Sequence, residues 1–376
     1  MTAPHPPAPG GTVPGGTVLV EHQRLATSGA RGVLAFHAGG ELRLAIPQLA
    51  ADIPGTPAHM NGGDSNIDMR LYRWSGGRFV DDGRLPVPGG EDAVFFQIGD
   101  MDFLATASIR TGSGPYDLNT DSVLYRRAGD GWEAFQRFPT FAAKQWHYFV
   151  VGNRRFLALA QGVTIDGAVA RHPRRSCIFE WDGNRFVDFQ TVEGGWGYNW
   201  VDFELDGQNY LGYADHMSPS HLMIWNGRSF APFQEFAPQG GRAFHMFRAD
   251  GHVWLAFANL TGESMLYRWQ AGRFIVHQSL GGPGAREFAV AQTEHALLFI
   301  KINFIHGTPA APKTDLFSSV YQWKGGRLEV IEKFPTSGGT DGAVFAADGQ
   351  VFLAVSNSLS RDIRFREDTV IYRVNA

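Results

Sequence analysis

The chain has 376 residues, of which 44% are hydrophobic and 19% charged, with 29 Phe, 10 Trp and a formal net charge of -4. The negative charge and the lack of any Lys/Arg cluster argue against nucleic acid as a partner. The single cysteine, Cys177, excludes an intrachain disulfide and a cysteine-based zinc site.

Residues 1–17 are rich in Pro and Gly and predict a disordered tail, because nothing in them can offset the entropy cost of ordering. They have neither the basic start nor the apolar run of a secretory signal. No segment of the chain approaches the roughly 20 apolar residues of a membrane-spanning helix. We therefore expect a soluble, cytoplasmic protein with no membrane partner.

A repeat follows the tail. The stretch LYRWSGGRF at 71–79 returns as LYRWQAGRF at 266–274, and alignment on its aromatic position gives seven copies at intervals of 44 to 54 residues. The aligned residues are Tyr72, Tyr125, Phe179, Met223, Tyr267, Tyr321 and Tyr372, and Trp follows two residues later at Trp74, Trp181, Trp225, Trp269 and Trp323. Periods of this length are typical of repeat architectures, in which such aromatic residues pack neighbouring units together.

Each copy contains four short runs rich in aromatic and β-branched residues and bounded by Gly, Asp and Asn, which is the signature of strands. The last copy ends at 370–376 without its final strand, whereas LVEHQRL at 19–25 is an unmatched final strand at the start of the chain. This permutation predicts an all-β fold over residues 18–376, a single seven-bladed β-propeller with four antiparallel strands per blade. The N-terminal strand would complete the last blade and close the ring.

The repeated pattern Y-x-W-x-G-x-F-x-x-x-Q-x-L, followed by G-A-x-D-x-x-x-F and F-L-A-V-A, resembles the EAR repeat, also called the epitempin or EPTP repeat. The Gln of the pattern matches Gln23, Gln136, Gln190, Gln234 and Gln278, and it is replaced by Gly83 and Glu332. The resemblance covers residues 18–374 and implies the propeller fold. Better-known members of that family are secreted proteins that bind receptors, and their repeat Asp lines the central channel.

The copies differ most in the connections between their second and third strands. These are residues 47–66, 107–121, 161–175, 215–220, 258–264, 303–317 and 357–367. In a propeller they all lie on one face, where we expect the binding residues to concentrate. The fourth and fifth connections are short, so we expect that side of the face to be open.

The position of the repeat Asp reads Gly32, Asp92, Gln145, Asn199, Ala243, Glu287 and Asp341. Carboxylates at Asp92, Glu287 and Asp341 that converge by pseudo-symmetry could bind a hard cation such as Ca²⁺ through oxygen. The alternative is that these side chains hydrogen-bond the strand ends and solvate the channel. No cofactor is expected to be obligatory.

One residue earlier, the copies carry a mostly cationic set at the predicted channel mouth. It consists of Arg31, Lys144, Arg242 and Arg286, with Glu91, Tyr198 and Thr340 at the remaining positions. Such a rim is compatible with an anionic ligand. The simpler interpretation is that these charges form an exposed, solvated surface.

A cluster of aromatic and histidine residues occupies the entry to the third and fourth blades. It comprises Trp146, His147, Tyr148, Trp196, Tyr198, Trp200 and Asp202, with His216 and His221 from the short fourth connection and His245 equivalent to His147. A concave, aromatic site with His and Asp at its edge is typical of a small-molecule pocket, in which His147, His245 and Asp202 could transfer protons without a cofactor. The alternative is that the aromatic residues only continue the packing between blades.

Two functions remain open. The propeller could be a binding module for a small molecule or a protein near the channel mouth, or a cofactor-independent isomerase, cyclase or lyase that uses the aromatic pocket. The sequence contains no P-loop, nucleophile elbow, HExxH zinc motif or dinucleotide fingerprint. A deep, dry cavity beside His147 and His245 would favour the enzyme, and we favour the binding module.

Overall fold

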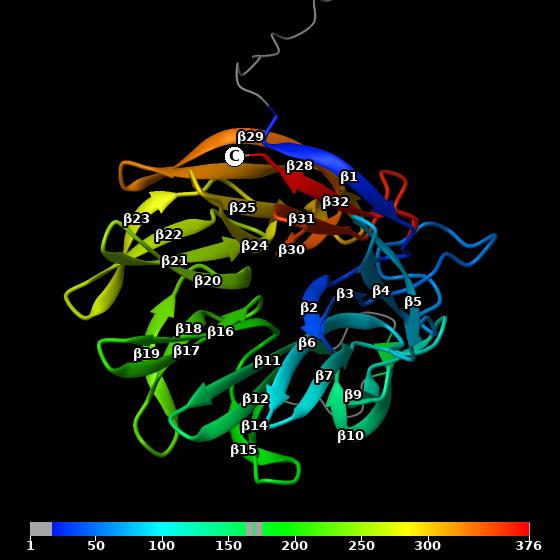
Figure 1. Ribbon diagram of the computed structural model, residues 1–376, viewed down its shortest axis with the longest axis horizontal. Coiled ribbons are helices and arrows are strands. Elements are labelled where there is room, and N and C mark those ends of the chain that lie inside the picture. Colours follow the sequence, from blue (N-terminus) through cyan, green and yellow to red (C-terminus); the bar gives the residue numbers. More distant parts are fainter. Residues whose placement is uncertain (1–16, 163–167, 170–174, 376) are drawn as a thin grey trace, which may run out of the picture.

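The computed structural model describes residues 17–162, 168–169 and 175–375. Within them the chain forms strands and no helix, and hence no helix that could cross a lipid bilayer. Seven four-stranded antiparallel sheets surround a central axis (Figure 1). The predicted all-β, seven-bladed propeller is confirmed. The predicted tail, residues 1–17, lies outside the described residues except for Thr17.

Each blade runs from an innermost strand beside the axis to an outermost strand at the rim. Blade 1 is β2 (Leu34–Ala38), β3 (Glu41–Ile46), β4 (Met69–Ser75) and β5 (Arg78–Leu85); blade 2 is β6 (Gly90–Ile98), β7 (Met101–Ser108), β9 (Asn119–Ala128) and β10 (Gly131–Phe141); blade 3 is β11 (Ala143–Val151), β12 (Arg154–Gln161), β14 (Ser176–Trp181) and β15 (Phe186–Val192). Blade 4 is β16 (Gly197–Leu205), β17 (Gln208–Asp215), β18 (Ser220–Trp225) and β19 (Phe230–Phe236); blade 5 is β20 (Gly241–Ala249), β21 (His252–Asn259), β22 (Met265–Gln270) and β23 (Arg273–Ser279). Blade 6 is β24 (Ala285–Gln292), β25 (Leu297–Asn303), β28 (Asp315–Lys324) and β29 (Arg327–Ser337); blade 7 is β30 (Gly339–Ala347), β31 (Gln350–Asn357), β32 (Thr369–Val374) and β1 (Leu19–Leu25).

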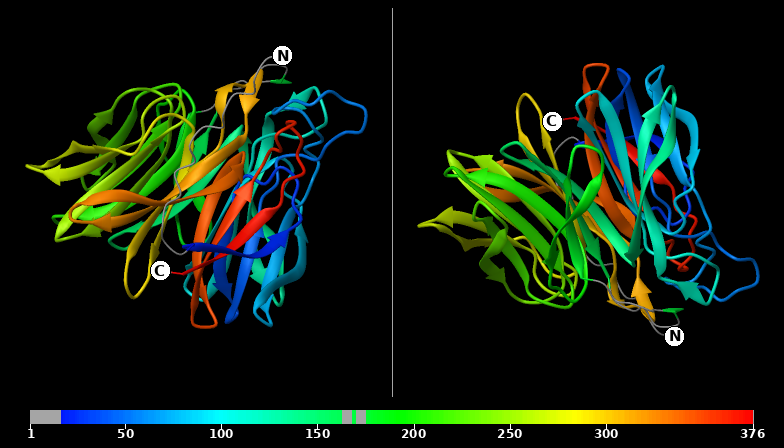
Figure 2. Two further views of the ribbon diagram at one scale, coloured as in Figure 1. Left: turned by 90° about the horizontal axis from the view of Figure 1, so that it is seen from above. Right: turned by 90° about the horizontal axis from the view of Figure 1, so that it is seen from below.

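Four shorter strands belong to the connections between the second and third strands of the blades. Strands β8 (Tyr116–Asp117) and β13 (Ala168–Val169) pair in parallel, and β26 (His306–Thr308) pairs with β27 (Ala311–Lys313) in a hairpin. The hairpin projects from one face of the ring (Figure 2). The variable connections therefore build up a single face, which we call the loop face.

The N-terminal strand closes the ring. Strand β1 pairs antiparallel with β32, from Leu19 opposite Val374 to Leu25 opposite Thr369, and the two strands lie side by side (Figure 1). Both leucines are buried. The predicted completion of the last blade is confirmed.

The blades are held together mainly by apolar packing. Each of seven core clusters joins two neighbouring blades, so that every junction of the ring has its own core. At the junction of blades 3 and 4, for example, the rings of Phe156 and Trp225 lie 5.8 Å apart. This arrangement accounts for the repeated aromatic residues, since one blade of about 44 residues cannot bury enough apolar surface alone.

The repeated glutamine joins the outer edges of the blades. Gln190 of blade 3 donates through Nε2 to the carbonyl of Phe230 in blade 4 at 2.8 Å, and its Oε1 accepts from the amide of Phe230 at 2.9 Å. We call this two-way contact the glutamine clasp. The same clasp is made by Gln23, Gln136, Gln234 and Gln278, which reach Phe79, Phe186, Phe274 and Leu328.

Two copies have another residue in place of the glutamine, Glu332 and Gly83, with different consequences. At the closing junction, Glu332 Oε2 accepts from the amides of Val18 and Leu19 at 2.6 and 3.1 Å, so a carboxylate fastens the N-terminal strand. Gly83 has no side chain with which to reach blade 2. It also has a φ of +104°, a conformation in which any larger residue would be strained.

Replacing Gln190 with Ala is expected to lower the free energy of unfolding by roughly 1 to 3 kcal/mol, because both backbone groups of Phe230 lose their side-chain partner at a half-buried edge. Chemical denaturation of the two proteins measures the loss. Gln292→Ala is the matched control, since the side chain of Gln292 is exposed and bonds only to nearby carbonyls. Equal stability of both variants would contradict a structural role for the clasp.

Candidate functional site

A β-bulge in the innermost strands builds the mouth of the channel. In β11 the ladder to β12 shifts register between Ala143 and Gln145, which leaves Lys144 unpaired, and β6, β16, β20, β24 and β30 have the same shift. A bulge redirects the side chain of its extra residue. Together with Arg31, which precedes β2, the residues placed in this way line one small cavity of about 40 Å³ on the axis. We call this set the charged ring: Arg31, Glu91, Lys144, Tyr198, Arg242, Arg286 and Thr340.

The charged ring is buried, so the expectation of an exposed, solvated rim is wrong. Glu91 is 3% exposed, and it contacts Lys144 Nζ at 3.3 Å, Arg286 Nη2 at 3.3 Å and Arg31 Nε at 3.6 Å. Burial alone would raise the pKa of Glu91, but the three surrounding cations hold that pKa at about 2. One carboxylate therefore serves three of the four cations in the ring.

Arg242 is the fourth cation. It is 6% exposed, and its guanidinium stacks on the Tyr198 ring at 3.6 Å from the centroid. Its Nε and Nη1 are buried and have no hydrogen-bond acceptor among the described residues. Burial lowers the pKa of Arg242, and the neighbouring Tyr198 and Glu91 oppose this effect. The ring therefore holds a buried guanidinium, two of whose nitrogens have no hydrogen-bond partner among the described residues.

A second cavity, of about 170 Å³, lies where the charged ring meets the connections of the loop face. Its apolar lining comes from the connections of blades 1, 2, 5 and 6 and includes Leu49, Met60, Ile109, Leu260, Phe304 and Ile305. Its polar lining adds Trp196 and His216 of blade 4, whose Nε1 and Nδ1 atoms are buried without a hydrogen-bond partner among the described residues. We call this space the mouth cavity.

The loops around the mouth cavity form a core of their own. Leu49, Met60, Ile109, Phe304 and Phe365 belong to one buried apolar cluster with residues from blades 2, 3 and 7. These residues stand in connections that do not repeat. Sequence reasoning therefore located the loops without identifying the residues in them that line the cavity.

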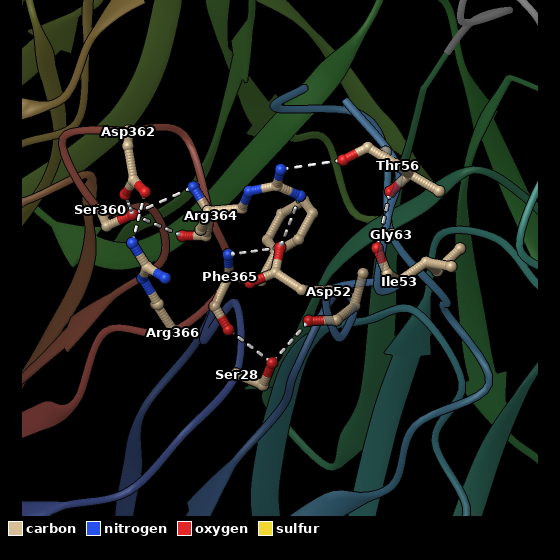
Figure 3. Close-up of polar contacts among 12 residues, drawn as sticks. Ser28, Asp52, Ile53, Thr56, Gly63, Ser360, Asp362, Arg364, Phe365 and Arg366 are labelled. Carbon is tan, nitrogen blue, oxygen red and sulfur yellow. Dashed lines mark hydrogen bonds and ion pairs between the residues drawn. The ribbon is translucent and has the colours of Figure 1, made fainter. Parts of the chain in front are cut away.

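Polar contacts fasten the blade 1 and blade 7 connections to each other (Figure 3). Arg364 Nη2 donates to the carbonyl of Thr56 at 2.8 Å, and the amide of Phe365 donates to Asp52 Oδ1 at 3.2 Å. Ser28 Oγ bridges the carbonyls of Phe365, at 2.6 Å, and Ala50, at 3.0 Å. This part of the wall is thus held in place by hydrogen bonds as well as by packing.

Arg110 supports the cavity from blade 2. Its guanidinium stacks on Tyr116 at 3.7 Å and donates to Ser65 Oγ at 2.8 Å and to the carbonyls of Asn61 and Gly62. This buried arginine orders the blade 1 connection. It could not be identified from the sequence, because its position is not charged in the other copies.

The residues at the repeat-Asp position lie one layer below. Asp92 Oδ2, Gln145 Oε1 and Asn199 Oδ1 each accept from an amide of the next blade, at 2.9, 2.7 and 3.0 Å. Asp341 Oδ2 also accepts from an amide of the next blade, that of Val33, at 2.9 Å. Glu287 instead accepts from the amide of Phe288, the next residue in its own strand. The geometry favours the hydrogen-bonding interpretation of this layer.

Carboxylates nevertheless gather there. Asp92, Glu287 and Asp341 line the small cavity on the axis, and burial raises the pKa of all three, that of Asp92 to about 7. Within residues 17–162, 168–169 and 175–375, no group of three or more His, Cys, Asp or Glu side chains forms a site for a metal ion. The predicted calcium site stays a prediction.

The aromatic cluster predicted at the entry to blades 3 and 4 divides into two groups. Trp196, Tyr198 and His216 line the mouth cavity, with Arg31, Arg242 and Arg286. Trp146 and Trp200 are each 2% exposed and pack between blades, Trp146 against Phe138 of blade 2 and Trp200 in the core that blades 3 and 4 share. Tyr148 stacks on Phe96 at 4.2 Å. These three residues pack the blades, because their repeated positions face the neighbouring sheet and not the axis.

The predicted catalytic residues do not meet at the channel mouth. His147 Nε2 lies 2.8 Å from Asp202 Oδ1, and His245 packs edge-on against Phe299 at 5.8 Å. Neither histidine lines either cavity on the axis. His221 lies beside an open groove between the outer strands of blades 3 and 4. Neither cavity on the axis is therefore the deep cavity beside His147 and His245 that would favour an enzyme.

The fold defines the class of this protein, a seven-bladed β-propeller with four antiparallel strands per blade. Comparison with known families finds an EPTP domain at residues 229–270, which is β19 followed by the first three strands of blade 5. The predicted resemblance to the EAR, or EPTP, repeat is confirmed. The matched repeat therefore begins one strand before the blade, with the last strand of blade 4. The same shift by one strand leaves β1 at the start of the chain to complete blade 7.

Two similar proteins carry this repeat in their names. The human thrombospondin-type laminin G domain and EAR repeat-containing protein is 27% identical over 97 residues, and the mouse protein of the same name is 28% identical over 97 residues. Each match covers 25% of this chain and 14% of the relative. The similarity therefore concerns a small part of each of these relatives.

Proposed function

We propose that this protein is a binding module that holds a small molecule in the mouth cavity. The observation that carries the proposal is Arg242, a buried guanidinium that lines the cavity with two donors left without an acceptor among the described residues. Buried polar groups are normally hydrogen-bonded, so unpaired donors at a cavity indicate a missing partner. The EPTP match supports a binding role in general.

The surroundings favour a small molecule over a protein. Connections from several blades enclose the mouth cavity, and their apolar residues form a core with the cavity beside it. A protein partner would contact the outer surface of these loops instead. A concave site with an apolar lining and a few polar groups is the usual form of a small-molecule site.

A cavity-filling variant tests this function. Met60 is buried and lines the cavity, so Met60→Trp should occupy the space. Met217→Trp is the control, because Met217 is exposed on the short connection of blade 4 and does not line the cavity. Compounds from a metabolite library that raise the Tm of the wild type should also stabilise Met217→Trp and should not stabilise Met60→Trp.

Two results would contradict the proposal. Equal stabilisation of the wild type and both variants would place binding elsewhere on the molecule. A library without any stabilising compound, together with no small molecule released from the purified protein on denaturation, would leave the cavity without a ligand.

We also propose a hard cation in the layer below, held by Asp92, Glu287 and Asp341, because three carboxylates line one small cavity. Added Ca²⁺ is expected to raise the Tm of the wild type, since a ligand that binds only the folded state stabilises it, and a chelator should reverse the effect. Asp341→Asn should not respond. An equal response of wild type and variant, or none, would leave these side chains with their hydrogen-bonding role alone.

A further inference from the structure

The charge around the mouth cavity is strongly unbalanced. Five cations line it, and Glu91 is the only carboxylate among its lining residues in the described part of the chain. Glu91 is shared by Arg31, Lys144 and Arg286, and Arg110 is satisfied by Ser65 and two carbonyls. The positive charge that remains is centred on Arg242.

The open hydrogen-bonding atoms in the cavity are mostly donors. The guanidinium of Arg242 contributes Nε and Nη1, and the indole of Trp196 contributes Nε1. An indole or guanidinium N–H can only donate. His216 Nδ1 is also open, and burial lowers the pKa of this histidine to about 4, so its ring is neutral near pH 7. A ligand that satisfies this set must present acceptor oxygens.

The plane of the principal donor is fixed before any ligand arrives. Arg242 Cζ lies over the Tyr198 ring at 3.6 Å from its centroid, and Lys144 Nζ lies 5.1 Å from the same centroid. A planar guanidinium matches the oxygens of a carboxylate or phosphate group, and such charge-assisted hydrogen bonds are stronger than neutral ones. The cationic side of the cavity is thus prepared for an anionic head group.

The opposite side of the cavity has a different character. Its lining residues Leu49, Met60, Ile109, Phe304 and Ile305 present apolar groups next to the cations. A free inorganic ion would leave this apolar surface without contacts. An organic body attached to the anionic group would cover it.

We propose that the ligand of the mouth cavity is a small organic anion, with its carboxylate or phosphate oxygens on Arg242 and its apolar body against the connections of blades 1, 2 and 6. This inference rests on the function proposed above and specifies the class of ligand. The anion supplies the acceptors that Arg242 and Trp196 lack. It also offsets the cost of burying Arg242, for which the described residues provide no salt bridge.

The test uses matched probes on the full-length protein. Benzoate and phenyl phosphate carry the anion on the same ring, benzamide is the neutral counterpart of benzoate, and inorganic phosphate lacks the apolar body. Isothermal titration should detect benzoate or phenyl phosphate. Benzamide should bind roughly tenfold more weakly or worse, the loss expected when a hydrogen bond to a charged group is not made. Inorganic phosphate should also bind more weakly, because it leaves the apolar wall uncovered. The better of the two aromatic anions identifies the head group.

The decisive variant is Arg242→Gln. This variant should bind the aromatic anion roughly 10- to 100-fold more weakly, the loss expected when a hydrogen bond to a charged group is removed. Its Tm without ligand should equal or exceed that of the wild type, because it removes a buried charge that has no carboxylate partner. Arg248→Gln is the matched control, since Arg248 lies on the same strand with an exposed side chain and bonds the carbonyl of Glu204.

Each alternative outcome has a definite meaning. If benzamide binds as tightly as benzoate, or if Arg242→Gln binds the aromatic anion as tightly as the wild type does, the proposal of an anionic ligand is wrong. If neutral compounds bind and Met60→Trp blocks them, the small-molecule function stands and the inference fails. Inorganic phosphate binding as tightly as phenyl phosphate would overturn the role of the apolar wall.

Discussion

Deleting residues 1–26 is expected to destabilise the whole propeller, whereas deleting residues 1–16 should leave its Tm nearly unchanged. The longer deletion removes all of β1, including the buried side chains of Leu19 and Leu25. Burial of the two leucines alone contributes roughly 3 to 6 kcal/mol. The longer deletion also removes the hydrogen bonds to β32, the clasp from Gln23 to Phe79 and the amide groups that donate to Glu332.

Thermal unfolding followed by circular dichroism measures both deletions. Loss of β1 exposes the edge of β32, so the longer deletion is also expected to aggregate more readily. Adding the peptide of residues 17–26 in trans should partly restore the Tm, because the separate peptide can pair with the exposed edge of β32. Small and equal effects of the two deletions would refute closure of the ring by this strand.

Acidification from pH 7 to pH 4 is expected to destabilise the wild type by about 3 kcal/mol more than it destabilises His245→Gln, the free energy that corresponds to a pKa shift of this size. Burial lowers the pKa of His245 from 6.5 to about 4. Between these two pH values the histidine is protonated in the unfolded chain and neutral in the folded protein. The folding free energy is therefore unaffected above the pKa of the unfolded state, and the folded protein loses stability as the pH falls toward the pKa of the folded state.

Chemical denaturation at neutral pH and at several steps down to the folded pKa measures the effect. His295→Gln is the control, because His295 lies exposed in the hairpin between β24 and β25. The control should follow the wild type at every pH. If His245→Gln follows it as well, the histidine titrates freely in the folded state and its packing against Phe299 does not restrict its protonation.

The fold could be predicted from the sequence because every part of it is repeated. Seven copies of one pattern reveal the strands, and the unmatched strand at 19–25 reveals how the ring closes. The same logic identified the glutamine positions, although their two-way contact with the next blade is a matter of geometry. A repeat identifies which residues are equivalent, and equivalence is sufficient for a fold with rotational symmetry.

The site was predicted only in part, for two physical reasons. The positions of Arg31, Arg242 and Tyr198 were found from the repeat, but their burial depends on non-repeating loops and, for Arg242 and Tyr198, on a bulge. Trp146 and Trp200 were wrongly expected at the mouth, since alternation along a strand decides whether a side chain faces the axis or the neighbouring blade. Met60 and Phe304 were not identified at all, because nothing in the repeat marks them.

Gly83 gives the ring a weak point with a definite position. Across the described residues, six junctions are fastened at their outer edge by Gln23, the other four clasp glutamines or Glu332, and the junction between blades 1 and 2 has none of these side chains. Slow fluctuations of a closed ring concentrate where the fewest bonds must break. Amide hydrogen exchange should therefore be fastest, among the outermost strands, where β5 of blade 1 meets blade 2. Fraying of the outer edge would begin there, while Arg110 and its partners keep the blade 1 and blade 2 connections together at the mouth cavity.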